Sequence, residues 1–265
     1  MMYQCDVGEA YYEVFGPEEA PAVMFSHGVA MDHRTFMPQI QALQDQYRVI
    51  VWDMPYHGKS PAVSRSLPYS NTCGDMMMGI LDELRVEKAV LAGLSLGSLV
   101  IQKAADRYPE RVAASIHISG ASLYPRYAQA FKICKPFMPL MHLLPSGWLN
   151  RTFARHKALT EDTQEYLTET MARTGKPALV HLMNAMLDDM VQGLCGEITH
   201  PLLILVGDHD LTVLQNLSRR WHKQSQHSIL AQVPQAHHIL NQDNPQECNR
   251  HITAFLQMLR KEDVI

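Results

Sequence analysis

One serine in this sequence stands where its hydroxyl could act as a nucleophile. Ser95 is the centre of the pentapeptide GLSLG at residues 93–97, which follows an apolar run at 88–93 and precedes apolar residues at helical spacing. A strand that turns directly into a helix strains the backbone at the serine, and the two glycines let strand and helix pass closely. The hydroxyl would then be exposed beside the free N–H groups of the helix start. A glycine-rich turn with an incidental serine is the alternative.

Serine is a poor nucleophile at neutral pH, so the site must supply a base, normally a histidine held in one tautomer by a carboxylate. Two downstream segments contain such groups, first the acids and then the histidines. Each segment offers two candidates, Asp208 and Asp210 in the first and His237 and His238 in the second. The order Ser, Asp, His at the ends of three predicted strands predicts a catalytic triad.

The elements that must place these residues are short apolar runs without alternation, which is typical of strands covered by helices on both faces. The spacing leaves room for one helix between successive runs, and this predicts a parallel, doubly wound sheet. An antiparallel hairpin at 2–15 leads into the sheet, which gives eight strands in total. The predicted parallel strands are 22–26, 48–53, 88–93, 112–119, 201–206 and 228–233.

The strand rhythm stops between residues 120 and 199, where the pattern predicts helices such as 160–173 and 177–195. We interpret 120–199 as a helical cap, with 1–119 and 200–265 forming the core. An excess of apolar side chains favours a lid over an apolar pocket. Packing of the insertion's own small core is the alternative for any one of them. These side chains include Met138, Leu144, Trp148, Met183 and Met186.

Taken together, these motifs resemble the α/β-hydrolase superfamily, in particular its serine-nucleophile esterase and enol-lactonase branch, over almost the whole chain. Members typically carry His-Gly after the first parallel strand, which Ser26-His27-Gly28 matches. They also carry Asp-x-Pro-x-His-Gly-x-Ser, which residues 53–60 match, and then the serine elbow. The resemblance implies the α/β-hydrolase fold, with a mostly parallel eight-stranded sheet, helices on both faces and a helical cap inserted after the sixth strand.

The same resemblance chooses between the paired candidates. The family's Gly-x-x-Asp assigns the triad acid to Asp210. Its Ala-Gly-His with a proline seven residues later matches Ala236 and Pro245, which aligns the catalytic histidine on His238. His237 then occupies the position of the usual glycine.

An oxyanion hole is implied as well, built from two backbone N–H groups that face the developing negative charge. The resemblance assigns one donor to Leu96, after the nucleophile, and the other to Val29, after the His-Gly motif. His27 would brace this loop. Tyr56 replaces a customary glycine, and we expect it to shape the pocket rim.

The activity that the resemblance implies is hydrolysis of a carboxylic ester, lactone or related carbonyl bond of a small, largely apolar molecule through an acyl-enzyme. A serine at the nucleophile position argues against haloalkane dehalogenase and epoxide hydrolase activities, because similar proteins with those activities place an aspartate there. Two alternatives stay open. One is hydrolysis of a carbon–carbon bond by the same three residues, and the other is a ligand receptor or signalling regulator that retains the triad.

Composition narrows the remaining classes of function. A chain of 265 residues can bury one large core, and a net charge of -4 offers no basic face for nucleic acid. The five scattered cysteines form no CxxC pair, which favours neither a disulfide framework nor a zinc site and suits the cytoplasm. We therefore expect a small-molecule substrate, no cofactor or metal, no nucleic-acid or membrane partner, and a monomer or homodimer.

Overall fold

The computed structural model describes residues 1–124 and 135–265, so part of the expected cap, 125–134, lies outside the described residues. Within the described chain, eight strands form one sheet in the order β1-β2-β4-β3-β5-β6-β7-β8. The pairs β1–β2 and β2–β4 are antiparallel, and the other pairs are parallel. The strands are β1 (Met2–Cys5), β2 (Gly8–Phe15), β3 (Ala22–Ser26), β4 (Arg48–Trp52), β5 (Ala89–Leu94), β6 (Val112–Ile118), β7 (Leu202–Gly207) and β8 (Ser228–Val233). The predicted eight strands and the leading hairpin are confirmed.

The five central strands explain the unbroken apolar runs of the sequence. Every residue of β3, β4, β5, β6 and β7 is buried. The edge strands β1 and β8 are partly exposed, because each has a neighbour on one side only. The strand predicted at 88–93 is observed one residue later, as β5 at Ala89–Leu94, because pairing with β6 continues to Leu94.

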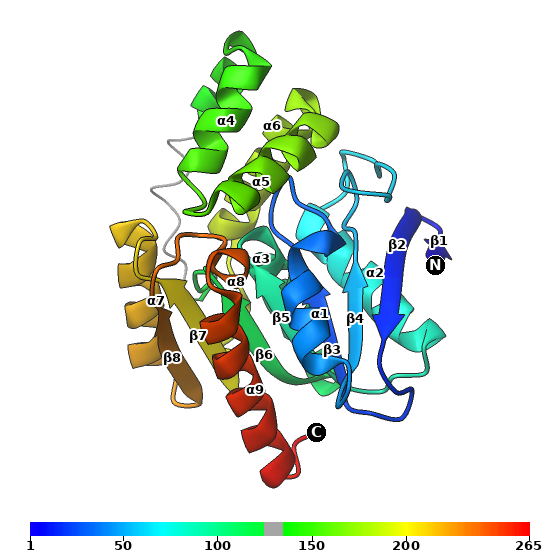
Figure 1. The fold of residues 1–265 in the computed structure, drawn as a ribbon. Helices are drawn as coiled ribbons and strands as arrows, with labels where there is room; N and C mark the ends of the chain where they lie inside the picture. The colour runs from blue at the N-terminus through cyan, green and yellow to red at the C-terminus, as the bar shows by residue number, and fades with distance from the viewer. Residues whose placement is uncertain (125–134) are drawn as a thin grey trace.

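Helices cover both faces of this sheet. Figure 1 shows α1 and α9 in front of the sheet, with α2 and α3 behind it. Each of these pairs is also in contact, α1 with α9 and α2 with α3. The core helices are η1 (His33–Phe36), α1 (Met37–Leu43), α2 (Tyr69–Glu83), α3 (Leu96–Arg107), η2 (Pro109–Arg111), α7 (Thr212–Gln224), α8 (Leu240–Asp243) and α9 (Pro245–Lys261).

The segment between β6 and β7 is helical in its described part. It contains η4 (Lys135–Leu143), α4 (Ser146–Arg155), α5 (Glu161–Thr174) and α6 (Lys176–Gln192). The prediction that the last helix runs to residue 195 was wrong, because Gly193 adopts a φ of 67° and ends it.

The helices α4, α5 and α6 stack on one end of the sheet (Figure 1). Two hydrogen bonds identify this end. The N–H of Asp32, after β3, donates to Tyr166 Oη of α5 at 3.0 Å, and the N–H of Ile239, after β8, donates to the Lys157 carbonyl at 3.0 Å. The helices therefore lie over the carboxyl ends of the parallel strands, where ligands bind in open α/β sheets.

Candidate active site

Ser95 occupies a strained turn between β5 and α3. Its backbone has φ 53° and ψ -109°, and α3 begins at the next residue. A Cβ at Gly97 would lie 2.0 Å from the Ser26 carbonyl oxygen, and one at Gly93 would lie 2.4 Å from the carbonyl carbon of Gly97. Only glycine fits these two positions. Ser95 is partly exposed while its neighbours in the pentapeptide are buried, as expected from the sequence.

His238 lies within hydrogen-bonding distance of this serine. Its Nε2 is 2.9 Å from Ser95 Oγ, and its Nδ1 is 3.0 Å from Asp210 Oδ2. With Asp210 ionised, Nδ1 must carry the proton of the neutral ring, which leaves Nε2 free to accept the serine proton. Burial lowers the pKa of His238, the positive charge of Lys157 lowers it further, and Asp210 opposes both effects. The ring is therefore neutral at pH 7 and can act as a base.

Asp210 is the carboxylate that holds this histidine. Its side chain is fully buried, and Oδ1 also accepts a hydrogen bond from the N–H of Leu211 at 2.8 Å. Burial alone would raise the pKa of Asp210, but the hydrogen bond to His238, and the charge of that ring when acid protonates it, lower the pKa below its usual value. Asp208 lies elsewhere, because its Oδ1 accepts from the N–H of Ala236 at 3.1 Å and contacts the ring of His209.

His237, the other candidate base, braces the loop instead. Its Nδ1 accepts a hydrogen bond from the N–H of His238 at 2.8 Å and lies 4.0 Å from Asp210 Oδ1. Its own N–H donates to Asp243 Oδ2 at 2.9 Å. The structure thus brings Ser95, His238 and Asp210 together.

The loop after β3 lies against the serine turn. β3 and β5 end in register, with Ser26 opposite Gly93, and the close approach at Gly97 also involves the His27 carbonyl oxygen. The N–H groups of Val29 and Leu96 donate no hydrogen bond to any described residue. An oxyanion hole would need two such uncommitted donors.

Two buried histidines hold this loop in place. His27 Nε2 accepts from the N–H of Met54 at 3.0 Å, and His57 Nε2 accepts from the N–H of Ala30 at 2.9 Å. Burial lowers the pKa of His57 to about 3, so its ring stays neutral and can accept this bond. The expected bracing role of His27 matches these contacts.

A pocket of about 360 Å³ opens at Ser95 and His238. Its wall is mostly apolar, and the helical segment contributes Met138, Met183 and Met186 to it. Other apolar side chains of that segment face away, since Leu144 is 37% exposed and Trp148 is 52% exposed. The excess of apolar residues thus lines the pocket only in part.

Tyr56 does not shape this pocket as we expected. Its φ of 72° explains why a glycine would suit the position. Its ring packs against His181 of α6, with 5.0 Å between ring centroids, and lies outside the pocket lining.

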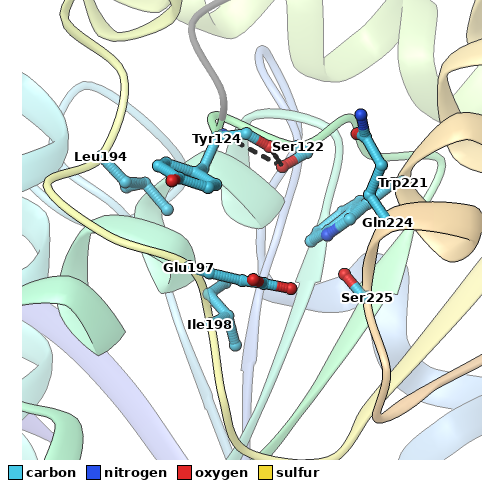
Figure 2. Close-up of a pocket in the computed structure, with 8 residues that line it drawn as sticks. All are labelled: Ser122, Tyr124, Leu194, Glu197, Ile198, Trp221, Gln224 and Ser225. Atoms are coloured by element: carbon cyan, nitrogen blue, oxygen red, sulfur yellow. Dashed lines mark hydrogen bonds between the residues drawn. The ribbon is translucent and has the colours of Figure 1, made fainter.

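A second pocket of about 210 Å³ lies apart from these residues. Its lining comes from the segment after β6, the segment after α6 and helix α7, with Tyr124, Glu197 and Trp221 among the side chains (Figure 2). In the described part of the chain, no group of histidine, cysteine, aspartate or glutamate residues is arranged to hold a metal ion. No described helix is long and apolar enough to cross a membrane.

Sequence reasoning missed two residues near the site. Lys157 lines the pocket, and Asp243 binds the backbone of both His237 and Leu159. Neither residue belongs to a motif, and each reaches the site only through the packing of the helical segment on the histidine loop.

The sequence model described as the alpha/beta hydrolase fold matches residues 21–159. The chain belongs to this family. It is 27% identical to 3-oxoadipate enol-lactonase 1 of Acinetobacter baylyi, over 94% of this chain and 93% of that one. It is 26% identical to a putative carbamate hydrolase, RutD, of Pantoea ananatis, over 93% of each chain.

Solved structures agree on the architecture. The enol-lactonase of Burkholderia xenovorans superposes with a TM-score of 0.79 at 21% identity, over 96% of this chain and 99% of that one. The expected α/β-hydrolase fold is confirmed. The family and its named relatives support hydrolysis as the class of reaction.

Proposed function

We propose that this chain is a serine hydrolase that cleaves a carboxylic ester, a lactone or a related acyl bond of a small molecule through an acyl-enzyme. The observation that supports it most directly is the continuous contact from Ser95 Oγ to His238 Nε2 at 2.9 Å and from His238 Nδ1 to Asp210 Oδ2 at 3.0 Å. A buried carboxylate, a neutral imidazole and a partly exposed hydroxyl in that order are the groups that nucleophilic acyl transfer needs.

The first half of the reaction forms the acyl-enzyme. His238 Nε2 takes the Ser95 proton as Oγ attacks the carbonyl carbon, and Asp210 stabilises the resulting imidazolium. The N–H groups of Val29 and Leu96 hold the oxyanion. The bond to the leaving group then breaks, and that group departs with the proton from His238.

Water completes the reaction. His238 removes a proton from a water molecule that attacks the acyl carbon, and the second oxyanion is held by the same two N–H groups. Collapse of this intermediate releases the acid, and the proton returns to Ser95 Oγ. No step draws on a group outside this chain and water.

The helical segment would act as the cap of this site. Residues 1–119 and 200–265 would form the catalytic core, and 120–199 would cover the pocket and limit the access of bulk water to it. Four pocket methionines from η4 and α6 support this role. They also favour a largely apolar substrate, because methionine adapts its shape to apolar groups.

Two relatives are named as an enol-lactonase and as a putative carbamate hydrolase. Both names indicate acyl chemistry, but they differ in the type of bond that is cleaved. A carbon–carbon hydrolase would use the same three residues on a diketone. Short acyl esters, lactones, carbamates and diketones should therefore be assayed side by side, and we expect the ester or lactone to be cleaved fastest.

The decisive experiment is labelling with a fluorophosphonate followed by peptide mapping. We expect a single hyperreactive serine in the peptide that contains Ser95, and no labelling of Ser95→Ala. Rapid ester turnover by Ser95→Ala would contradict the proposal. Very slow turnover by the wild-type chain, together with ligand-dependent association of a second protein, would instead favour a receptor.

A further inference from the structure

The pocket at Ser95 contains one cation that the proposed mechanism does not use. Lys157 follows α4 and lines this pocket, where it is the single lysine or arginine among the described lining residues. The rest of the wall is mainly methionine, leucine and valine. Lys157 is half-buried, so its amine loses part of its hydration in such a wall, and a partner of opposite charge would replace it.

No described residue supplies such a partner in direct contact, although the charge of Asp210 acts on Lys157 from a longer distance. The Lys157 side chain makes no hydrogen bond or ion pair to residues 1–124 or 135–265, and Nζ lies 5.8 Å from the centroid of the Phe153 ring. Lys103 of α3 behaves differently. Its side chain is buried and its Nζ donates to the Gly193 carbonyl at 2.7 Å, whereas Lys157 is half-buried.

The backbone of Lys157 is fixed relative to the catalytic histidine. Its N–H donates to the Ala154 carbonyl at 3.0 Å, and its carbonyl accepts from the N–H of Ile239, the residue after His238, at 3.0 Å. The side chain therefore extends from a defined point beside the reacting groups. Burial lowers the pKa of Lys157, and the charge of Asp210 offsets this effect only in part.

We propose that Lys157 selects substrates that carry a carboxylate at the end of an otherwise apolar chain. The ester would lie at Ser95, the carbon chain against the methionine and leucine wall, and the carboxylate on the Lys157 ammonium group. A charge-assisted hydrogen bond in this apolar setting would supply the partner that the amine lacks. This inference rests on the proposed function, since it names a substrate class for the same pocket.

Matched pairs of esters test this selection. The monomethyl esters of succinic, glutaric and adipic acids carry the negative charge, and the dimethyl esters are their neutral counterparts. We expect the wild-type chain to show a higher kcat/KM for the monomethyl ester at one chain length at least. Lys157→Met should lower kcat/KM for that ester by about 10- to 100-fold, mainly through KM, and should lower it for the dimethyl ester by a much smaller factor.

Two further variants separate charge from structure. Lys157→Arg keeps the charge and should retain most of the preference for the monomethyl ester. Lys223→Met makes the same change of net charge at the far end of α7, where the side chain is exposed, and should leave the preference unchanged. The positive charge of Lys157 lowers the pKa of His238, so all rates should be compared at a pH above the titration of His238 in every variant and below that of Lys157, whose pKa burial lowers.

Equal loss for both esters in Lys157→Met would overturn the proposal, because Lys157 would then act on the triad and not on the substrate. A wild-type chain that cleaves both esters at the same rate would also overturn it.

Binding separates this inference from the proposed function. Titration calorimetry on Ser95→Ala should show tighter binding of the monomethyl ester than of the dimethyl ester. The double variant Ser95→Ala, Lys157→Met should bind the two esters equally. If the wild-type chain cleaves neither ester while this binding preference is present, the proposed function fails and the role of Lys157 stands. Absence of the binding preference would refute the role of Lys157 even in an active esterase.

Discussion

The pocket has two sides that are built differently. The sheet side consists of Ser95, Asp210, His238 and the loop at 27–30. Backbone contacts that tolerate little movement hold this side in place. Examples are the Ser95 N–H on the Ile118 carbonyl at 2.9 Å and the glycine contacts between α3 and β3. The helical side consists of the pocket residues of η4 and α6 together with Lys157. Its side chains are flexible and make few polar contacts.

This difference separates chemistry from selectivity. Proton transfer from Ser95 to His238 needs a defined distance, and displacements of about 1 Å can lower the rate by roughly 100-fold. Methionine side chains rotate about three bonds and can fit several apolar shapes. Substitutions on the sheet side should therefore change the rate of the reaction, while those on the helical side should change which molecules react.

The largest effect is expected at the catalytic histidine. His238→Asn removes the base that contacts Ser95 Oγ and should lower kcat by about 10,000-fold or more, measured on an activated ester. His237→Asn is the matched control, because an amide oxygen can still accept the hydrogen bond from the N–H of residue 238. We expect it to lose less than about tenfold. Similar losses in the two variants would mean that the wrong ring has been assigned.

A glycine substitution compares the two sides directly. Gly97→Ala places a Cβ 2.0 Å from the Ser26 carbonyl oxygen and should lower the free energy of unfolding by more than about 3 kcal/mol. Gly147→Ala in α4 meets only Arg151 Nη2 at 3.8 Å, so it should keep or slightly raise stability. Urea unfolding of both variants measures the contrast. If Gly97→Ala is as stable as the wild-type chain, the sheet side is less rigid than we infer.

The two sides also differ in how far the sequence predicts them. Strands β3 to β7 and the serine turn could be predicted because buried runs and the glycines of the pentapeptide report local geometry. Asp208 and Asp210 fit the acid role equally well by residue type, so the choice needed the family resemblance. Lys157 and Asp243 could not be predicted, because their contacts join segments more than 80 residues apart in the chain.

A buried acid joins the helical side to the core. Asp189 of α6 is 5% exposed and accepts a hydrogen bond from the Ser70 hydroxyl of α2. Burial raises the pKa of Asp189 to about 6 from 3.8, so the folded chain binds this proton more tightly than the unfolded chain. Stability from this group is present below about pH 4 and is lost as the pH rises to about 6, by up to about 3 kcal/mol.

Asp189→Asn isolates the contribution of this ionisation to the free energy of unfolding. An amide keeps an acceptor for Ser70 and cannot ionise, so the variant should gain stability relative to the wild-type chain as the pH rises from about 4 to about 6. Urea unfolding of both proteins across this range gives the difference free of the other carboxyl groups. A constant difference would show that the folded chain binds this proton no more tightly than the unfolded chain.

The smallest effect is expected at Asp243, which ties the helical side to the histidine loop. Its carboxylate accepts hydrogen bonds from the N–H groups of His237 at 2.9 Å, Leu159 at 3.0 Å and Thr160 at 3.2 Å. Asp243→Ala releases all three donors, and we expect kcat to fall by about tenfold because the loop that holds His238 is less restrained.

The rate of fluorophosphonate labelling at Ser95 separates a positioning role from loss of fold, because the small probe reports the contact between Ser95 and His238 without needing the helical side. Labelling of Asp243→Ala should slow by a similar factor well below its Tm, while Asp243→Asn, which keeps one acceptor oxygen, should recover part of the rate. Slower ester turnover with unchanged labelling would place the effect on substrate binding. In that case the sheet side keeps its geometry without this contact to the helical side, and the helical side acts on substrate binding alone.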